Sequence, residues 1–252
     1  MTSAQRNAIT TIPKGLTVFD TETNSFWFYT GTAWAELAAG WKLRGNSTTT
    51  SFDFIGTTND MPLNFRSNNF TVGTLLVDNV AFGLSTGSTG YSNVALGKNA
   101  LRLNSKNNIV GIGDSALAKN NGIRNTAIGS KALYYNYDGL NNTAVGFEAL
   151  FSNTAGQLNT ATGSQALNSN TDGIANTGMG AYALNNNIGG NYNVAIGLSS
   201  LSNNTTGSSN VAVGYSTLNN ITTGSYNTAI GYGAGPATNL SNTTGIGYNA
   251  DV

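Results

Sequence analysis

The sequence predicts an all-β fold in which most of the chain winds as a parallel β-solenoid of about eleven coils, preceded by a small β-hairpin module. Three observations predict it: a short unit recurs along the chain, each copy ends at a glycine beside apolar and very small residues, and most copies carry a second glycine. Such a period indicates a repeat architecture, because each unit buries its apolar side chains only by stacking on its neighbours.

The repeated unit is seen at residues 125–129 (Asn-Thr-Ala-Ile-Gly) and again at residues 227–231. A unit of 14 to 17 residues is too short for a pair of helices, whereas a short strand closed by Gly and Asn corners fits one coil. Stacked at about 4.8 Å, eleven coils form a rod of about 50 Å. The framing glycines are Gly83, Gly97, Gly113, Gly129, Gly146, Gly163, Gly180, Gly197, Gly214, Gly231 and Gly247.

Two columns of side chains are predicted to face the core. The residue before the framing glycine is apolar in ten of eleven units, and a leucine stands four residues after the glycine in eight units. The residue two places before the glycine is always Ala or Gly, which predicts that another backbone lies close on that side. The predicted core positions are Ile128, Val145, Ile196, Val213, Ile230, Leu133, Leu150, Leu167, Leu184 and Leu201.

The rest of each unit has the chemistry of turns. A second glycine, such as Gly139 or Gly156, stands seven residues before most framing glycines, and we expect it to supply the positive φ of a tight corner. An asparagine column beside that corner is expected to form a hydrogen-bonded ladder or to cap the turn. Its members are Asn136, Asn153, Asn170, Asn187 and Asn204.

Three regions are predicted: an attachment module at residues 1–45, a neck with short strands at 46–78 and the rod at 79–252. In the first, two β-prone runs at 16–19 and 26–29 flank a polar turn, which indicates a β-hairpin with an aromatic core. In the neck, the segments around Phe54, Leu63 and Thr74 alternate or cluster apolar residues as short strands do.

Composition excludes several kinds of chemistry. The chain has no Cys and no His, so we expect neither a metal site built on those residues nor Cys or His catalysis, and we predict no cofactor. No apolar run reaches about 18 residues, so no membrane insertion is expected. All eleven Lys and Arg lie at or before Lys131, which argues against binding of nucleic acid by the distal rod.

The repeats resemble those of the heads of trimeric autotransporter adhesins of the YadA type, through Asn-x-Ala-Ile-Gly followed by x-x-Ala-Leu over residues 79–252. The resemblance implies a left-handed β-roll of three intertwined or side-by-side chains, although units of 16 or 17 residues are longer than is typical of that family. The N-terminal part is similar to tail-fibre and surface-fibre proteins of bacteria and phages, through residues 1–9, 15–20, 24–29, 31–34 and 54–65. In those proteins the first residues lie inside a longer chain, so Met1 is expected to be an internal residue.

No catalytic residue is predicted, and we expect no enzyme activity. The glycines lack the pattern of a phosphate-binding loop, and Asp138 and Glu148, the carboxylates nearest to a pair, do not recur. A row of tyrosines, Tyr215, Tyr232 and Tyr248, follows successive framing glycines near the end of the chain. It is a possible glycan-contact surface, and a row that only stiffens the rod is the alternative.

The sequence thus favours an extracellular structural fibre or adhesin segment, projecting from a cell, a virion or an injection device and mediating attachment. Its expected partners are two further copies of the chain, a glycan or protein receptor on a cell surface, and an attachment partner at the N-terminal end. Two alternatives stay open. One is a single-chain solenoid that binds ice or another regular polymer through a column containing Thr126 and Thr143, and the other is a tailspike that degrades polysaccharide.

Overall fold

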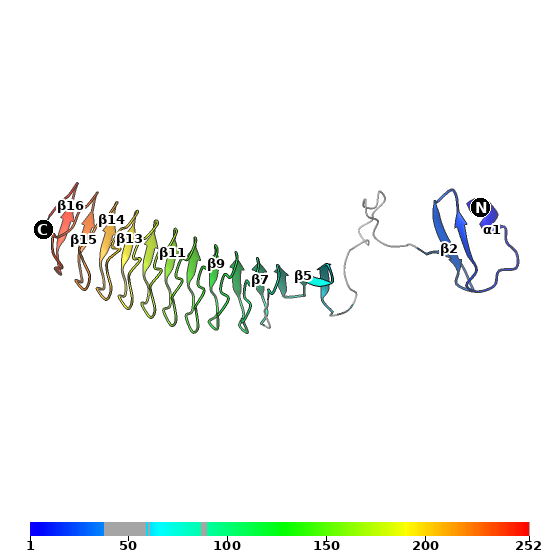
Figure 1. The fold of residues 1–252 in the computed structure, drawn as a ribbon, viewed down its shortest axis with the longest axis horizontal. Helices are drawn as coiled ribbons and strands as arrows, with labels where there is room; N and C mark the ends of the chain where they lie inside the picture. Colours follow the sequence, from blue (N-terminus) through cyan, green and yellow to red (C-terminus); the bar gives the residue numbers. More distant parts are fainter. Residues whose placement is uncertain (38–58, 60, 87–89, 252) are drawn as a thin grey trace. The chain divides into compact units, whose positions relative to one another are not determined.

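The structure is a computed structural model that describes residues 1–37, 59, 61–86 and 90–251. The chain forms two compact units, Met1–Gly56 and Thr57–Val252. Figure 1 shows the elements of both units.

The first unit is a three-stranded antiparallel sheet with one short helix. The helix α1 (Ser3–Asn7) begins with a capping box between Thr2 and Gln5. The strands are β1 (Thr17–Asp20), β2 (Ser25–Tyr29) and β3 (Trp34–Glu36), in the order β1-β2-β3. Residues 20–25 form the turn between β1 and β2, so the predicted hairpin is confirmed.

The second unit begins with an antiparallel hairpin of β4 (Leu63–Ser67) and β5 (Phe70–Leu75). β5 also pairs antiparallel with β6, the first strand of the rod, so these two strands of the predicted neck belong to the rod's own sheet. The predicted strand around Phe54 lies outside the described residues.

The rod is a parallel β-solenoid, as predicted. Successive strands follow one another along the rod (Figure 1). They pair in parallel and in register, so that Ala144 lies between Ala127 and Ala161. The eleven strands are β6 (Asn79–Phe82), β7 (Asn93–Leu96), β8 (Ile109–Ile112), β9 (Thr126–Ile128), β10 (Thr143–Val145), β11 (Thr160–Thr162), β12 (Thr177–Met179), β13 (Val194–Ile196), β14 (Val211–Val213), β15 (Thr228–Ile230) and β16 (Thr244–Ile246).

The interior of each coil is filled by alanine from the strand and by leucine from the returning limb. The predicted leucine column is confirmed, since Leu133, Leu150, Leu167, Leu184 and Leu201 are all 0% exposed. The alanines two places before the framing glycines are also fully buried in the middle of the rod. At Gly178, which replaces alanine in one coil, a Cβ would lie 3.4 Å from Leu167, so the two columns pack directly on each other.

The second predicted core column was wrong for the single chain. Ile128 and Ile196 are each 39% exposed and Ile230 is 42% exposed, while Val145 and Val213 are only partly buried. Neighbouring residues of a strand point to opposite sides, and the leucine limb leaves room inside for no more than a methyl group. The small residue of each pair therefore points inward, and the branched residue points out of the coil.

Two buried columns of asparagine close the corners. The predicted ladder is confirmed: Asn187 Nδ2 donates to Asn170 Oδ1 at 2.8 Å and to the Gly190 carbonyl at 3.0 Å, and the other members repeat this pattern. A second column begins each strand, where the Asn159 backbone N–H donates to Asn142 Oδ1 at 2.9 Å. The amide side chains thus satisfy corner backbone groups and link successive coils.

The two glycine columns have different causes. Gly163, a framing glycine, has a φ of 136°, and a Cβ there would lie 2.6 Å from the carbonyl carbon and oxygen of Gly180 in the next coil. The positive φ predicted for the second column was wrong, since Gly139 and Gly156 have no positive φ. Glycine is needed there because a Cβ at Gly156 would lie 2.6 Å from Asn170 Nδ2, in the asparagine ladder.

Candidate functional site

The outward side of the solenoid sheet is an uncharged surface of apolar side chains and threonines, which we call the outer face. It is made by the first and third residues of strands β9 to β16 and by the matching residues of β6 to β8, such as Thr126 and Ile128 or Val194 and Ile196. Each of these side chains is exposed or partly buried, and each is apolar or threonine. Monomers rarely expose contiguous apolar patches of this extent, so the outer face is a candidate interface.

No charged side chain lies among the outer-face positions of the eleven strands. The face therefore carries no group that could act as an acid, a base or a metal ligand. Its rows are in register, so that Thr143 lies beside Thr160 and Val145 beside Thr162. A flat, uncharged and regular surface of this kind can bury against a similar surface at little cost in desolvation.

The predicted tyrosine row exists as a stacked ladder. The ring centroids of Tyr215 and Tyr232 are 5.0 Å apart and those of Tyr232 and Tyr248 are 5.3 Å apart, with interplanar angles of 15° and 19°. Stacking turns the ring faces toward one another, so the row presents ring edges and hydroxyl groups along the rod. The row ends at Tyr248, which is 77% exposed, and at Tyr215, which follows Leu198 in the column, so the faces between the rings are covered and the arrangement favours a stiffening role.

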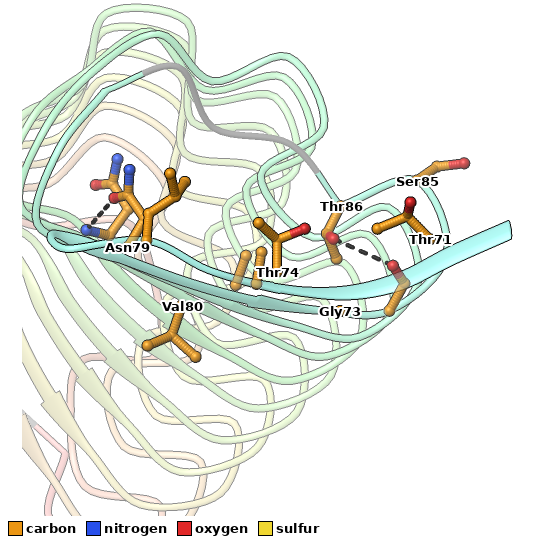
Figure 2. A pocket seen from close by; sticks show the side chains of 12 residues that line it. Thr71, Gly73, Thr74, Asn79, Val80, Ser85 and Thr86 are labelled. Atoms are coloured by element: carbon orange, nitrogen blue, oxygen red, sulfur yellow. Dashed lines mark hydrogen bonds between the residues drawn. The ribbon is translucent and has the colours of Figure 1, made fainter. Parts of the chain in front are cut away.

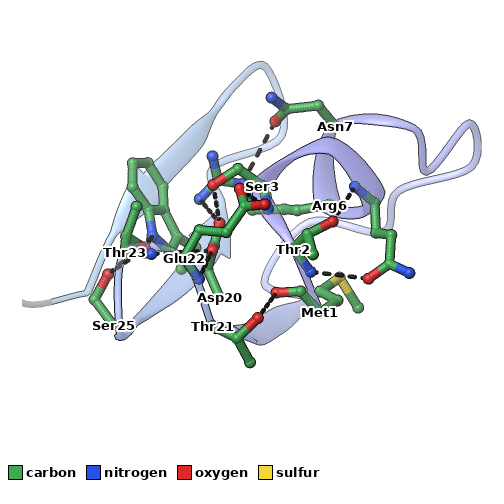
Figure 3. A network of polar contacts seen from close by, with 12 residues as sticks. Met1, Thr2, Ser3, Arg6, Asn7, Asp20, Thr21, Glu22, Thr23 and Ser25 are labelled. Carbon is green, nitrogen blue, oxygen red and sulfur yellow. Dashed lines mark hydrogen bonds and ion pairs between the residues drawn. The ribbon is translucent and has the colours of Figure 1, made fainter.

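A polar network ties the short helix to the sheet of the first unit (Figure 3). Arg6 Nη1 lies 2.9 Å from Asp20 Oδ2, which also accepts a hydrogen bond from the Ser3 hydroxyl at 2.7 Å. The other carboxylate oxygen accepts from the backbone N–H groups of Glu22 and Thr23. Burial raises the pKa of Asp20, but these hydrogen bonds and the Arg6 charge outweigh it and lower the pKa below its usual value.

The lowered pKa predicts that the first unit loses stability in acid. A carboxyl whose pKa is lower in the folded state contributes stability that is complete above its unfolded value, about 3.9, and is lost as the pH falls below it. We expect Asp20→Asn to be less stable at neutral pH and to show a flatter acid transition. Trp27 fluorescence would follow it, since the Arg6 guanidinium lies 3.7 Å from that ring. Glu36→Gln is the control, and an unchanged acid transition in Asp20→Asn would contradict the assignment.

The opposite side of that sheet is open and apolar. Phe19 and Phe26 pair across β1 and β2 with ring centroids 5.1 Å apart, yet they are 40% and 53% exposed. They line a shallow groove of about 290 Å³ together with Leu37, which is 60% exposed. Both rings are thus partly exposed in the single chain, which makes this side of the sheet a candidate contact surface.

The rod has a hollow of about 330 Å³ at its first coils (Figure 2). Its lining includes Thr74, Asn79, Val80 and Thr86, and no acid, base or charged group is among the lining residues. The Asn79 carboxamide is used within the protein, where its Oδ1 accepts from the Asn93 backbone N–H at 2.9 Å. The residues that line the hollow thus offer only uncharged polar and apolar groups to a ligand.

None of the helices within 1–37, 59, 61–86 and 90–251 is long and apolar enough to cross a bilayer. The same residues contain no group of three or more acidic side chains that could hold a metal ion.

Comparison with known proteins adds one match, at the first unit. Residues 1–52 match the family model of a phage tail like trimerisation region. The match covers the sheet with the open aromatic side, and together with the β-solenoid it supports a phage tail fibre-like protein. Neither the curated proteins nor the solved structures compared with the chain gave a match.

Sequence reasoning missed two features of these surfaces. It did not identify the buried ion pair of Arg6 and Asp20, whose partners lie apart in the sequence and meet through the fold. It also did not predict that Tyr134 and Tyr135, in the middle of the rod, form a cluster with Lys119. The spacing of the repeat could have predicted this cluster, because residues one period apart in the sequence lie side by side in a solenoid.

Proposed function

We propose that the chain is a homotrimeric structural fibre segment, in which three solenoids pack through their outer faces. The observation that carries the proposal is the coexistence of an uncharged apolar face along the rod with an N-terminal match to a trimerisation region. An interface seeded at one end and continued along the rod brings the same residues of each copy together. The resemblance of the repeats to trimeric adhesin heads supports the same arrangement.

The exposure of the outer face is the quantity that a trimer would change. Ile128, Ile196 and Ile230 are large apolar residues about two-fifths exposed in the single chain, and the same column holds Met179 and Ile246, which are 44% and 68% exposed. Burial of apolar surface contributes about 25 cal/mol per Å², so a row of this length supplies a large association free energy. In the proposed trimer this column lies in a core shared between chains.

Charge placed on the outer face tests the trimer. We expect the wild-type chain to have three times the monomer mass in light scattering, and the double variant Ile196→Asp/Ile230→Asp to dissociate or to lose at least tenfold in association constant. Like charges from three copies would meet without solvent, which costs several kcal/mol. The measurement is native mass over a dilution series.

Leu198→Asp is the matched control for this test, because Leu198 lies in the same coil as Ile196 and is 45% exposed but is not on the outer face. It should remain trimeric. A monomeric wild-type chain, or equal dissociation of both variants, would argue against the outer face as the interface.

We further propose that the fibre is extracellular or associated with a virion, attached at its N-terminal end and presenting the rod to a receptor. The N-terminal match to a phage tail like trimerisation region supports the virion-associated or extracellular placement. We expect no enzyme activity, and a reducing-sugar assay on surface polysaccharides distinguishes this fibre from a degrading tailspike.

One observation favours a second candidate, a solenoid that binds ice or a regular polymer. Thr126, Thr143, Thr160 and Thr177 lie in register on neighbouring strands, which makes a regular array of hydroxyl groups on the outer face. The array is short, because Val194 and Val211 continue the column. A trimer would cover this array, so a monomer with thermal hysteresis would favour the second candidate over the first.

A further inference from the structure

A notch interrupts one column of side chains on the rod. The position five residues after the framing glycine is occupied by Arg102, Ala118, Tyr134 and Phe151 in four successive coils. Because residues one period apart lie side by side, the small alanine leaves a gap between an arginine and an aromatic ring. The structure contains a notch of about 70 Å³ at this place, lined by Arg102, Ala118 and Tyr134 and also by Lys119.

The aromatic wall of the notch is held rigidly. Tyr134 stacks on Phe151 with ring centroids 5.5 Å apart and an interplanar angle of 17°, and Tyr135 packs edge-on at 4.7 Å. Since Phe151 covers one face of Tyr134 from the following coil, the other face is turned toward the coil of Ala118. Aromatic faces of this kind bind the C–H surface of a flat ligand, while the phenol group stays in water.

The opposite wall and the rim are cationic. Arg102 is exposed and Lys119 is half-buried, and neither takes part in the two ion pairs found among the described residues. Lys119 Nζ lies 4.6 Å from the centroid of the Tyr135 ring, which holds the ammonium group over the cluster. Between Lys98 and Lys131 the chain has six basic residues and a single acidic one, Asp114, and this excess remains when the pairing of Lys131 with Glu148 is counted, so the charge near the notch favours an anion.

We propose that this notch is a binding site for a carboxylate-bearing sugar of an acidic polysaccharide. One liquid water occupies about 30 Å³, so the notch admits a carboxylate but not a whole sugar ring. The carboxylate accepts hydrogen bonds from Arg102 and Lys119, and the ring lies at the rim against Tyr134 and Leu103, which is 59% exposed. The inference rests on the proposed attachment function only in taking the ligand to be a surface polysaccharide.

The test is a calorimetric titration of the full chain with a short oligogalacturonate and with the neutral galactose oligomer of the same linkage. We expect saturable binding of the acidic oligomer that weakens with salt, and at least tenfold weaker binding of the neutral one. Arg102→Asn, Lys119→Asn and Tyr134→Asn should each weaken binding about tenfold or more. The repeat itself supplies these replacements, since Asn168 and Asn186 occupy the corresponding positions in later coils.

Two further variants separate a built site from general attraction of charge. Arg124→Asn removes another exposed positive charge that does not line the notch, at a position where the next coil has Asn141, and it should change binding less than twofold. Ala118→Tyr closes the gap while keeping both cations, and it should abolish binding. Absence of binding by the wild-type chain, equal losses in Arg124→Asn and Arg102→Asn, or full binding by Ala118→Tyr would overturn the proposal.

The proposed trimer and the proposed binding site in the notch can be rejected independently of each other. Native mass reports the oligomeric state of every variant without reference to the sugar, and circular dichroism reports folding. A trimer that does not bind oligogalacturonate would therefore reject the notch alone, whereas a monomer that binds it would reject the trimer alone.

Discussion

Gly163→Val is expected to lower the stability of the rod by roughly 3 to 5 kcal/mol. Gly163 has a φ of 136°, a region of backbone conformation that β-branched residues avoid. A Cβ there would also lie 2.6 Å from the carbonyl carbon and oxygen of Gly180, a contact that only a separation of the coils could relieve. The framing glycines of successive coils lie against one another, so the added valine would meet backbone and not a flexible side chain that could move. The substitution is therefore expected to disrupt the stacking of these coils.

Urea unfolding followed by circular dichroism measures this effect, and hydrogen exchange locates it. The N–H of Gly180, which donates to the Thr162 carbonyl at 2.8 Å, should lose protection, while the distal coils should keep theirs. Ser164→Val is the matched control, because the neighbouring position is exposed and holds Phe147, Ala181 and Leu198 in other coils. The control should stay within about 0.5 kcal/mol of wild type, and the explanation fails if the two variants unfold alike.

The period itself allowed the fold class and the leucine column to be predicted from sequence. A leucine four residues after the framing glycine in eight of eleven units is explained by a stacked interior, and Leu150 and Leu167 are indeed fully buried. The strand column was misassigned because apolar character was taken as the mark of burial. Side-chain size was the better indicator of burial. The facing leucines leave room only for a methyl group at Ala144 and Ala161, whereas the outward position of Val145 is occupied by Thr162 in the next coil.

Backbone conformation was beyond the reach of the pattern. Leu150 and Leu167 both adopt a φ of 52°, a left-handed conformation that residue preference alone would assign to glycine or asparagine. The buried position of the side chain determines the residue there, and packing offsets the local strain. The second glycine column shows the reverse case, because Gly156 is required by the neighbouring asparagine side chains and not by its own φ.

The candidate surfaces were predictable only in part, because each depends on which side chains come together between coils. Tyr215, Tyr232 and Tyr248 share one place in the period, so their adjacency followed from the sequence. Their interplanar angles did not, and these angles decide that ring edges and not faces are presented. The notch at Ala118 could be predicted from the sequence only by noting that a small residue stands where the neighbouring coils have large side chains.

Asn187→Leu is expected to cost about 3 kcal/mol of rod stability, although leucine has a similar volume. Asn187 is fully buried, donates to Asn170 Oδ1 and to the Gly190 carbonyl, and accepts from Asn204 Nδ2 at 2.7 Å. Leucine would leave Asn170 Oδ1 buried without a donor, which alone costs roughly 1 to 3 kcal/mol. Denaturant unfolding measures the loss, and Asn186→Leu, on the exposed neighbour, is the control that should change little.

The end of the ladder indicates that the asparagines stabilise the rod through the hydrogen bonds between successive side chains and not through each amide group by itself. Ile221 occupies the ladder position after Asn204, and Asn204 Oδ1 is accordingly buried without a hydrogen-bond partner. The chain tolerates one such oxygen where the ladder stops, so a second one inside the ladder should be costly but not prevent folding. The double variant Asn170→Leu/Asn187→Leu should therefore lose less than the sum of the single variants, because it removes the unpaired oxygen together with its lost donor. Strictly additive losses would mean that the asparagines fill space independently, and the ladder would then not be the element that couples successive coils.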